Sequence, residues 1–311
     1  VVREIAIKQR LKLNEYGVFR KSGNRKIAGK TEEDVYRAIG LRYMEPEIRE
    51  NSGEIEAAAK GKLPNLIKYG SIRGDFHCHT VKSDGANRLD DMVAAAKKLG
   101  YEYIAITDHS KSERIAHGLP DDEMEKWLKE IKAAAAKEKK IKILAGSEVD
   151  ILPNGELDYP DDLLKKMDVV VGSVHSRFKS TKEEMTKRIL AAMGNRHLDI
   201  LAHPTGRRIG KREPYEVDLK KIFAAAAEKK VLLEINAHPE RSDLKDVLAR
   251  EAKGFGCKFV IDTDSHSTEN LNFMDLGVAI ARRAWLEPED VVNTRPLKEL
   301  PRFFRKLSID T

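Results

Sequence analysis

Residues 103–109 read YIAITDH, a short run of small and β-branched apolar residues that stops at an acidic residue and a histidine. A run of this length and composition predicts a buried strand. Six further runs of the same kind lie on either side of it, at residues 75–79, 141–146, 169–174, 198–202, 231–235 and 259–263. The sequence therefore predicts seven strands from about residue 71 onward.

Helical patterns separate these runs, at residues 89–99, 122–137, 181–193, 217–229 and 244–253. Strands that alternate with helices of about ten to fifteen residues indicate βα units around a parallel sheet. We therefore predict an α/β fold in which residues 71–311 form a seven-stranded, TIM-like β/α barrel, closed or nearly closed. Two short helices are predicted in the tail, at 288–292 and 297–307, packed against the barrel.

Residues 1–70 have a different pattern. Thr31 is positioned to cap a short helix that ends at Gly40, Pro46 interrupts the chain, and residues 53–60 form another helical pattern stopped by Gly61. These features predict a small N-terminal helical appendage and a linker. Because the chain begins at Val1 within an amphipathic charged segment, we expect a fragment of something longer.

The composition limits the class of protein. Of 311 residues, 41% are hydrophobic and 35% are charged, which is typical of a globular protein with a densely charged surface. The formal charge of +6 is compatible with a polyanionic partner but modest for this size. Cys78 and Cys257 form no C-x-x-C pair, which favours a reducing compartment, the cytoplasm. No apolar run approaches the ~20 residues that cross a bilayer, so no membrane partner is expected.

Histidines and carboxylates stand where the predicted strands end. In β/α barrels the carboxyl ends of the strands form the face that holds active sites. An isolated histidine in this position is most often a surface residue, but six of the nine histidines of the chain fall at these ends. The predicted metal ligands are nine in number: His77, His79, Asp84, His109, Glu148, His175, His203, Asp264 and His266.

The ligand types restrict the metal and the chemistry. Imidazoles mixed with carboxylates, without thiolates, suit Zn²⁺ or Mn²⁺, with Fe²⁺ as a further candidate. Nine ligands exceed the need of one ion, so we expect two or three divalent metals. Clustered divalent ions polarise a phosphoryl oxygen and activate water, so hydrolysis of a phosphate ester is the expected reaction. Phosphate-binding loops, dinucleotide-binding motifs and the G-x-S-x-G motif are absent from the sequence, which disfavours nucleotide-cofactor chemistry.

Cations that follow the strand ends are candidates for binding substrate phosphate: Arg177, Lys179, Arg207, Arg208, Lys211 and Arg212. A charged loop of this kind is often merely solvated. Arg241 is the preferred phosphate clamp, because a guanidinium makes planar two-point contacts with phosphate oxygens. His238 is a candidate metal ligand, proton donor or polar rim residue, and these three roles stay open. Asp108 is the remaining candidate for a catalytic residue.

Six motifs resemble the polymerase and histidinol phosphatase (PHP) domain: DFHCHT with SDG at 75–85, ITDHS at 106–110, GSE at 146–148, SVH at 173–175, AHP at 202–204 and TDSHS at 263–267. The resemblance covers residues 72 to about 307. It implies a distorted barrel with a trinuclear site. One metal would be held by His77, His79, Glu148 and Asp264, a second by Glu148, His175 and His203, and a third by Asp84, His109 and His266.

Three segments ahead of the barrel, LKLNEYG at 11–17, TEEDVYRAIGL at 31–41 and EIRE at 47–50, resemble the end of the polymerase core in prokaryotic family X DNA polymerases. Residues 1–70 would then be the remnant of that core plus a linker. The resemblance implies DNA 3′ ends as the substrate, for a 3′-5′ exonuclease, 3′ phosphatase or abasic-site nuclease. Asp34 is the only aspartate before Asp75, so the polymerase domain upstream is expected to be absent from this chain.

Two other functions compete with a DNA 3′-end phosphoesterase. A small-molecule phosphatase of the histidinol phosphate type would share the metals but favour a closed pocket. A non-catalytic scaffold would use metal only to stabilise the fold, and an incomplete ligand set would be its signature. His238 departs from the resemblance, which leads us to expect a small or amide residue there.

Overall fold

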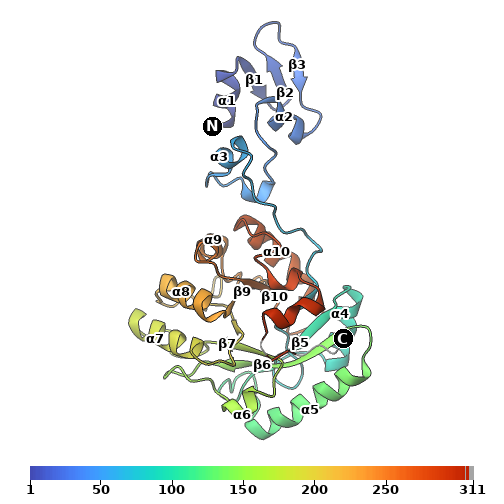
Figure 1. Cartoon of the computed structure of the whole chain (residues 1–311), viewed down its shortest axis with the longest axis vertical. Helices are drawn as coiled ribbons and strands as arrows, with labels where there is room; N and C mark the ends of the chain where they lie inside the picture. Colours follow the sequence, from blue (N-terminus) through green and yellow to red (C-terminus); the bar gives the residue numbers. More distant parts are fainter. Residues whose placement is uncertain (305, 308–311) are drawn as a thin grey trace. The chain divides into compact units, whose positions relative to one another are not determined.

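The computed structural model describes residues 1–304, 306 and 307. The chain separates into two compact units, residues 1–65 and residues 66–311. Figure 1 labels most of their helices and strands. No helix among the described residues is long and apolar enough to cross a membrane.

The first unit contains helices, as expected, and also a three-stranded antiparallel sheet that the sequence pattern did not predict. Its elements are α1 (Val2–Lys8), β1 (Leu11–Asn14), β2 (Gly17–Arg20), β3 (Lys26–Ala28), α2 (Glu32–Ala38), the 3₁₀ turn η1 (Pro46–Ile48) and α3 (Glu54–Ala59). The Thr31 hydroxyl accepts a hydrogen bond from the Asp34 amide, which confirms the predicted helix cap. Apolar and polar residues alternate in LKLN at 11–14, and Gly17 follows with φ 128°. Together these features are the local signal for the β1–β2 hairpin.

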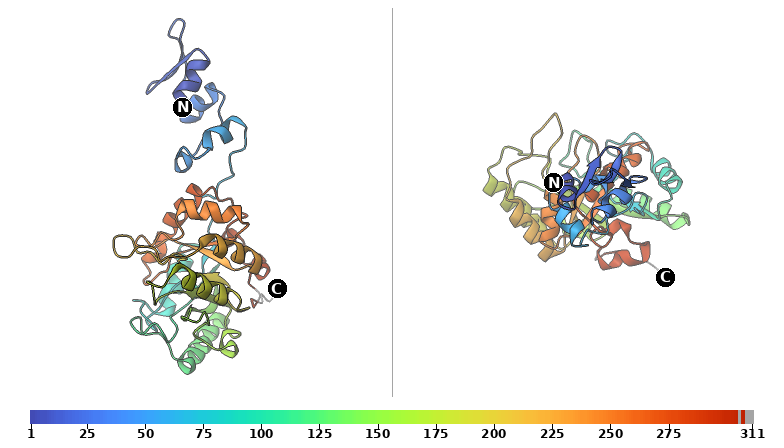
Figure 2. Two further views of the ribbon diagram at one scale, coloured as in Figure 1. Left: turned by 90° about the vertical axis from the view of Figure 1, so that its left-hand side faces the viewer. Right: turned by 90° about the horizontal axis from the view of Figure 1, so that it is seen from above.

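The second unit is the predicted barrel, a sheet of seven parallel strands surrounded by helices (Figures 1 and 2). The strands are β4 (Gly74–Asp75), β5 (Tyr103–Ile106), β6 (Lys142–Asp150), β7 (Val169–Ser173), β8 (Ile200–Leu201), β9 (Leu232–Asn236) and β10 (Phe259–Asp262). They are hydrogen-bonded in sequence order from β4 to β10. The helices are α4 (Leu89–Lys98), α5 (Asp121–Lys137), α6 (Asp161–Leu164), α7 (Lys182–Met193), α8 (Leu219–Lys229), α9 (Asp246–Gly254) and α10 (Met274–Arg283).

The first and last strands meet at a seam. Cys78, beyond the end of β4, forms a parallel bridge with Ser265, and the His79 amide donates to the Ser265 carbonyl at 2.8 Å. At the other end of these strands the Asn293 side chain donates to the carbonyls of Gly74 and Ile261. These contacts join β4 to β10, so the sheet closes almost completely.

The tail packs against the barrel as predicted, but its secondary structure differs. Two 3₁₀ segments, η3 (Val292–Thr294) and η4 (Leu297–Arg302), replace the expected helices, and Pro301 lies inside the second. A proline removes an amide donor and disfavours a regular helix. Residue 305, within the predicted 297–307 helix, lies outside the described residues. Phe304 packs against Phe76 with ring centroids 4.7 Å apart, so the tail closes the amino-terminal end of the barrel.

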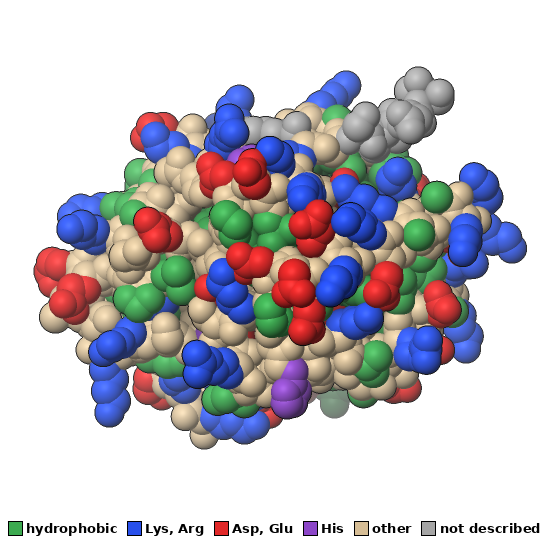
Figure 3. Space-filling model, turned by 90° about the horizontal axis from the view of Figure 1, so that it is seen from below, with side chains coloured by type: hydrophobic (Ala, Val, Ile, Leu, Met, Phe, Trp, Pro, Cys, Tyr) green, Lys and Arg blue, Asp and Glu red, His purple; other side chains and the backbone are tan. Residues whose placement is uncertain are grey.

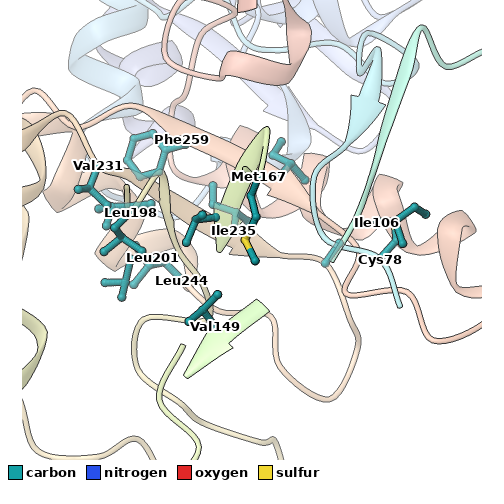
Figure 4. Packing of buried hydrophobic residues seen from close by; sticks show 14 of the residues in the cluster. Cys78, Ile106, Val149, Met167, Leu198, Leu201, Val231, Ile235, Leu244 and Phe259 are labelled. Carbon is teal, nitrogen blue, oxygen red and sulfur yellow. The ribbon is translucent and has the colours of Figure 1, made fainter. Parts of the chain in front are cut away.

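Apolar side chains fill both sides of the sheet. One cluster lies inside the barrel and includes Phe76, Tyr103 and Val171. The other lies between strands and helices, where Ile106, Val149 and Ile235 are fully buried (Figure 4). Both cores fix the strands, and thereby the positions of the polar residues at their carboxyl ends.

Candidate metal centre

The nine side chains predicted as metal ligands come together at the carboxyl ends of the strands. The strand ends themselves differ from prediction, because β4 stops at Asp75 and β6 continues to Asp150. Glu148 therefore lies inside a strand, where its neighbour across the ladder is Val171. The long β6 pairs first with β5 and then with β7, and this second ladder extends it beyond the predicted end at residue 146.

Glu148 lies at the centre of the cluster. Its Oε2 atom is 3.1 Å from His77 Nε2, 3.4 Å from His79 Nε2 and 3.2 Å from His109 Nδ1. Its Oε1 atom is 2.9 Å from His203 Nε2 and 3.3 Å from His175 Nε2. One carboxylate thus lies among five imidazoles, a position suited to a ligand that bridges two cations.

Two aspartates occupy the side of the cluster nearer the seam. Asp264 Oδ1 lies 3.2 Å from His79 Nε2 and 3.6 Å from His77 Nε2. Asp84 Oδ2 lies 3.2 Å from His266 Nε2, and its Oδ1 is 3.7 Å from His109 Nε2. The imidazoles of this region therefore face carboxylate oxygens on more than one side.

Three sets within the cluster could each hold a metal, since each member offers an atom within 4.8 Å of the others: His77, His79, Glu148 and Asp264; His79, Asp84, His109 and His266; and His109, Glu148 and His175. The first two sets contain the groupings implied by the resemblance. The third has His109 where the resemblance has His203, which nevertheless contacts Glu148 Oε1.

Several buried nitrogens of the cluster lack hydrogen-bond partners among the described residues. They are Nε2 of His77, both ring nitrogens of His79, Nδ1 of His109 and Nδ1 of His203. A buried polar atom without a partner is costly, and native structures rarely contain several together. Unpaired imidazole nitrogens facing carboxylates are what a divalent cation requires, so this donor set fits a metal centre.

The carboxylates of the cluster favour the charged state that binds cations. Burial opposes the charge on Glu148, but His109, His77 and His175 hold the pKa of its carboxyl well below the usual range. At Asp84 burial is likewise outweighed, here chiefly by the hydrogen bond with His266, and the pKa falls to about 2.

Two ligands have unusual backbone conformations. His203 has φ 28° and Asp264 has φ 52°, both in the left-handed region that non-glycine residues rarely adopt. Such strain is concentrated at functional sites, where surrounding contacts hold a side chain in a required direction. At His203 one such contact is its amide, which donates to Glu234 at 2.6 Å.

Sequence reasoning missed the carboxylates that support the histidines. Glu234 Oε1 lies 2.7 Å from His77 Nδ1, and Asp150 Oδ1 lies 2.6 Å from His175 Nδ1. Such contacts fix the tautomer and orient the opposite nitrogen toward a metal. The signal for Glu234 was a charged residue within the apolar run VLLEI at 231–235, and Asp150 lay beyond the predicted end of its strand.

Asp108 belongs to the support of a loop. Its carboxylate accepts hydrogen bonds from the Thr80 amide and hydroxyl, the Ser83 hydroxyl and the Trp127 indole. The Asp108 carboxylate is fully buried, and these four hydrogen bonds use the acceptor positions of its oxygens. We therefore propose a positioning role for Asp108, in place of the catalytic role predicted from the sequence.

A pocket of about 510 Å³ opens over the cluster, lined by Asp84, His109, Glu113, Ile115, Ala116, His175, Phe178, Arg208, Arg212, His238, Arg241, Asp264 and His266. Of the predicted phosphate-binding cations, Arg208 and Arg212 line it, as does the predicted clamp Arg241.

The other four predicted phosphate-binding cations are not part of this lining. Arg207 donates to the backbone carbonyls of Arg241 and Ser242. Lys211 pairs with Glu240 at 2.5 Å. Arg177 and Lys179 are exposed residues of the loop after β7. A role in phosphate binding stays a prediction for these four cations.

Comparisons with known proteins agree with this geometry. The PHP domain matches residues 75–238, and the DNA polymerase beta thumb matches residues 1–50. The chain is 40% identical over 305 residues to the DNA polymerase/3′-5′ exonuclease PolX of Bacillus subtilis, a match that covers 98% of this chain and 53% of that protein. The chain therefore spans about half the length of this relative.

Two further relatives cover mainly the barrel. A protein named as a probable phosphatase from Thermoanaerobacter sp. is 29% identical over 231 residues, 71% of this chain and 89% of the relative. A crystal structure described as a histidinol phosphatase from Listeria monocytogenes superposes on this chain with a TM-score of 0.52 at 14% sequence identity. The superposition covers 64% of this chain and 97% of that chain, and at this identity it shows a shared fold alone. Because the PHP match spans more than half of the chain, the chain belongs to the PHP domain family of metal-dependent phosphoesterases.

Proposed function

We propose that the chain hydrolyses phosphoester bonds at DNA 3′ ends, as a 3′-5′ exonuclease, 3′ phosphatase or abasic-site nuclease. The observation that carries the proposal is the set of buried, unpaired imidazole nitrogens around Glu148, at the base of a pocket lined by three arginines. The nine predicted ligands would hold two or three divalent ions, zinc or manganese, with iron as another candidate. When bound, such ions activate water and stabilise negative charge on phosphoryl oxygens.

Arg241 is placed to bind the phosphate. Its Nε donates to Asp264 Oδ2 at 2.8 Å, which fixes the plane of the guanidinium beside the cluster. Its Nη1 atom is buried and has no hydrogen-bond partner among the described residues. A guanidinium held by one edge keeps its remaining donors for a phosphate oxygen. Arg241 would thus bind and orient the substrate against the metal ligands.

We infer that His238 donates a hydrogen bond to an oxygen of the substrate. Its Nδ1 atom accepts a hydrogen bond from the Glu240 amide at 3.3 Å, so the neutral ring carries its proton on Nε2. Burial lowers the pKa of His238, which favours this neutral form. A neutral imidazole donates a hydrogen bond but does not release its Nε2 proton. Since His238 lines the pocket, we therefore assign it the role of a polar rim residue that hydrogen-bonds substrate, among the three roles that the sequence left open.

The distribution of charge supports DNA as the partner. Residues 1–31 contain nine Lys and Arg and two Asp and Glu, a net charge of +7 in a chain whose total is +6. The rest of the chain is therefore close to neutral. The face drawn in Figure 3 carries acidic and basic side chains interspersed. A short, strongly basic segment is the electrostatic footprint of phosphate-backbone binding.

The sheet of the first unit offers a surface for such binding. Lys12, Phe19 and Lys26 lie directly opposite one another across β1, β2 and β3, and both lysines are exposed. Val18, which alternation places on the other face, is fully buried. An aromatic ring between two cations suits a nucleic-acid strand. Together with the thumb match over residues 1–50, this favours the interpretation of residues 1–70 as the end of a polymerase core.

Strand-shortening and phosphate-release assays test the proposal. A 3′-labelled oligonucleotide and a 3′-phosphorylated one are incubated with Mn²⁺ and the protein, its His77→Ala variant, or His117→Ala as a control outside the cluster. We expect activity to fall by more than about 100-fold in His77→Ala, because removing a ligand should exceed the 10–100-fold effect of an outer-shell partner. Absence of both activities from the unaltered protein contradicts the proposal.

A small-molecule phosphatase is the second candidate, favoured by the relative named as a probable phosphatase, 89% of which is matched. The two functions differ in how DNA competes with a generic phosphate monoester. Strong competition at low salt supports the DNA substrate, whereas weak competition supports the small molecule. A protein that binds metal but hydrolyses neither substrate would instead be a scaffold.

A further inference from the structure

The pocket over the metal centre has an apolar part that metal binding does not explain. Ile115 and Ala116, in the loop between β5 and α5, and Phe178, in the loop between β7 and α7, line it together with the charged residues. A site for bare phosphate needs only cations and polar donors. Apolar lining indicates that part of the ligand is apolar or aromatic as well.

Ile115 has 90% of its side chain exposed, the highest value among the exposed large apolar side chains in the described part of the chain. One exposed apolar residue is ordinary on a protein surface. This one, however, lies in the wall of a pocket whose other residues are mostly charged residues or histidines. Packing within the loop leaves the apolar surface of Ile115 in water. Contact with a ligand would remove this surface from water.

Arg212 forms the planar end of a stack. Its guanidinium carbon lies 3.7 Å from the centroid of the Phe178 ring, and that ring lies nearly parallel to Tyr215, with centroids 6.4 Å apart. Tyr215 is buried and donates to the Pro204 carbonyl, and Arg212 Nε donates to the Gly206 carbonyl at 2.8 Å. The stack is therefore anchored in the core at one end and reaches the pocket at the other.

We propose that Ile115, Phe178 and Arg212 form a subsite for the nucleobase of the terminal nucleotide. The base stacks on the guanidinium plane of Arg212, which Phe178 supports from behind, and Ile115 contacts the base or its sugar. This inference rests on the proposed function, because it places the base beside a phosphate held at the metal centre. Guanidinium and aromatic planes are common stacking platforms for unpaired bases.

The subsite makes a specific prediction about substrates. Every base has a π-face, so the subsite tolerates any sequence but requires that a base be present, which among the proposed activities favours the exonuclease and the 3′ phosphatase over the abasic-site nuclease. A strand that ends in a normal nucleotide should therefore be hydrolysed better than one that ends in an abasic nucleotide, by about 10- to 100-fold in kcat/KM. The difference should lie mainly in KM, since stacking acts on binding and not on the reacting atoms.

The experiment compares these two strands with Mn²⁺ for the full chain and three variants. Arg212→Lys keeps the charge but removes the plane, Phe178→Leu keeps apolar volume but removes the ring, and Ile115→Ala shortens an exposed side chain. Val247→Ala, in α9, is a control for an exposed apolar residue outside the pocket. Circular dichroism checks that each variant is folded.

A second experiment titrates the protein with an oligonucleotide that ends in 3′-terminal 2-aminopurine. Stacking quenches the fluorescence of this base, so the titration does not depend on turnover.

We expect the kcat/KM ratio of the two strands to fall toward one in the three pocket variants and to stay unchanged in Val247→Ala. Equal rates on both strands with the unaltered protein, or variants that slow both strands equally, overturn the subsite. If the unaltered protein hydrolyses neither strand, the exonuclease form of the proposed function fails, and the titration alone decides the subsite. In that case, quenching that is present with the unaltered protein and disappears in Arg212→Lys supports the subsite. No quenching with the unaltered protein, or quenching that Arg212→Lys retains, overturns the subsite.

Discussion

Glu234 is a charged residue in an apolar strand, and its carboxylate explains how one histidine of the centre is oriented. It contacts His77 Nδ1 and accepts a hydrogen bond from the His203 amide. With Nδ1 engaged, His77 presents Nε2 toward Glu148 and Asp264. The orientation of a predicted metal ligand therefore depends on a carboxylate outside the nine predicted ligands.

We predict that Glu234→Gln weakens binding of divalent metal by about 10- to 100-fold, the usual effect of removing a partner that orients a ligating histidine. The amide keeps the size of the side chain but not its charge. Competition with a fluorescent chelator measures the affinity, and Glu240→Gln, at the edge of the pocket loops, serves as the control. An affinity equal to that of the unaltered protein would exclude this role.

Asp243 provides a pH-dependent test of the buried polar groups around the site. Burial raises the pKa of its carboxyl to about 6, although the Thr205 amide donates to it at 2.9 Å. Its pKa in the unfolded chain is about 3.9. The folded state therefore binds the proton more tightly, and the stability this provides is present below about pH 4 and disappears as pH rises through about 6.

Asp243→Asn stays neutral at every pH and should remove this dependence. Relative to the unaltered protein, the variant should gain stability between about pH 4 and pH 7, by roughly 2–3 kcal/mol for a shift of about two pKa units. Urea unfolding of metal-free protein at several pH values measures the difference. A difference that is constant with pH would show that Asp243 has an ordinary pKa.

Among the elements, the strands of the barrel were predictable because their apolar runs are sharply bounded, and YIAITDH at 103–109 shows this most clearly. Their ends were not, since pairing decides where a strand stops. β4 (Gly74–Asp75) retains only Asp75 of the five predicted residues, because beyond Asp75 the pairing across the seam is reduced to an isolated bridge between Cys78 and Ser265. β6 extends to Asp150 because β7 pairs with its second half.

The candidate site was more predictable than the boundaries of the elements. A strand end that differs from the prediction by up to four residues, as in β4 and β6, still leaves the predicted ligands on the same rim, so all nine converge. Arg207 and Asp108 show the limit of this reasoning. Sequence places both near the rim, but it does not show that Arg207 donates to backbone carbonyls or that Thr80, Ser83 and Trp127 occupy the Asp108 carboxylate.

The sheet of the first unit carries its own prediction. If the row formed by Lys12, Phe19 and Lys26 contacts the DNA backbone, the double variant Lys12→Glu/Lys26→Glu should bind DNA more weakly. It should also lower the slope of log K against log salt by about two, roughly one for each phosphate that is no longer neutralised. Fluorescence anisotropy at several salt concentrations measures both. Lys126→Glu/Lys129→Glu, on the exposed face of α5, is the matched control, and equal slopes in both double variants would contradict the assignment.

At the scale of the whole molecule, charge and chemistry reside in different units. The basic residues that account for the net charge of the chain lie within residues 1–31, whereas the nine candidate ligands lie between His77 and His266. A basic segment raises the local concentration of a polyanionic substrate without taking part in the reaction. Removing charge from the first unit should therefore affect binding of DNA more than hydrolysis of a small phosphate ester.

The central claim is that the side chains around Glu148 hold a cluster of divalent ions. Metal analysis by mass spectrometry, on protein loaded with Zn²⁺ or Mn²⁺ and dialysed, tests it most directly. We predict two or three ions per chain, and at least one fewer in Glu148→Gln, because this carboxylate contacts five imidazoles. One ion or none in the loaded protein, or the same number in Glu148→Gln, would contradict it.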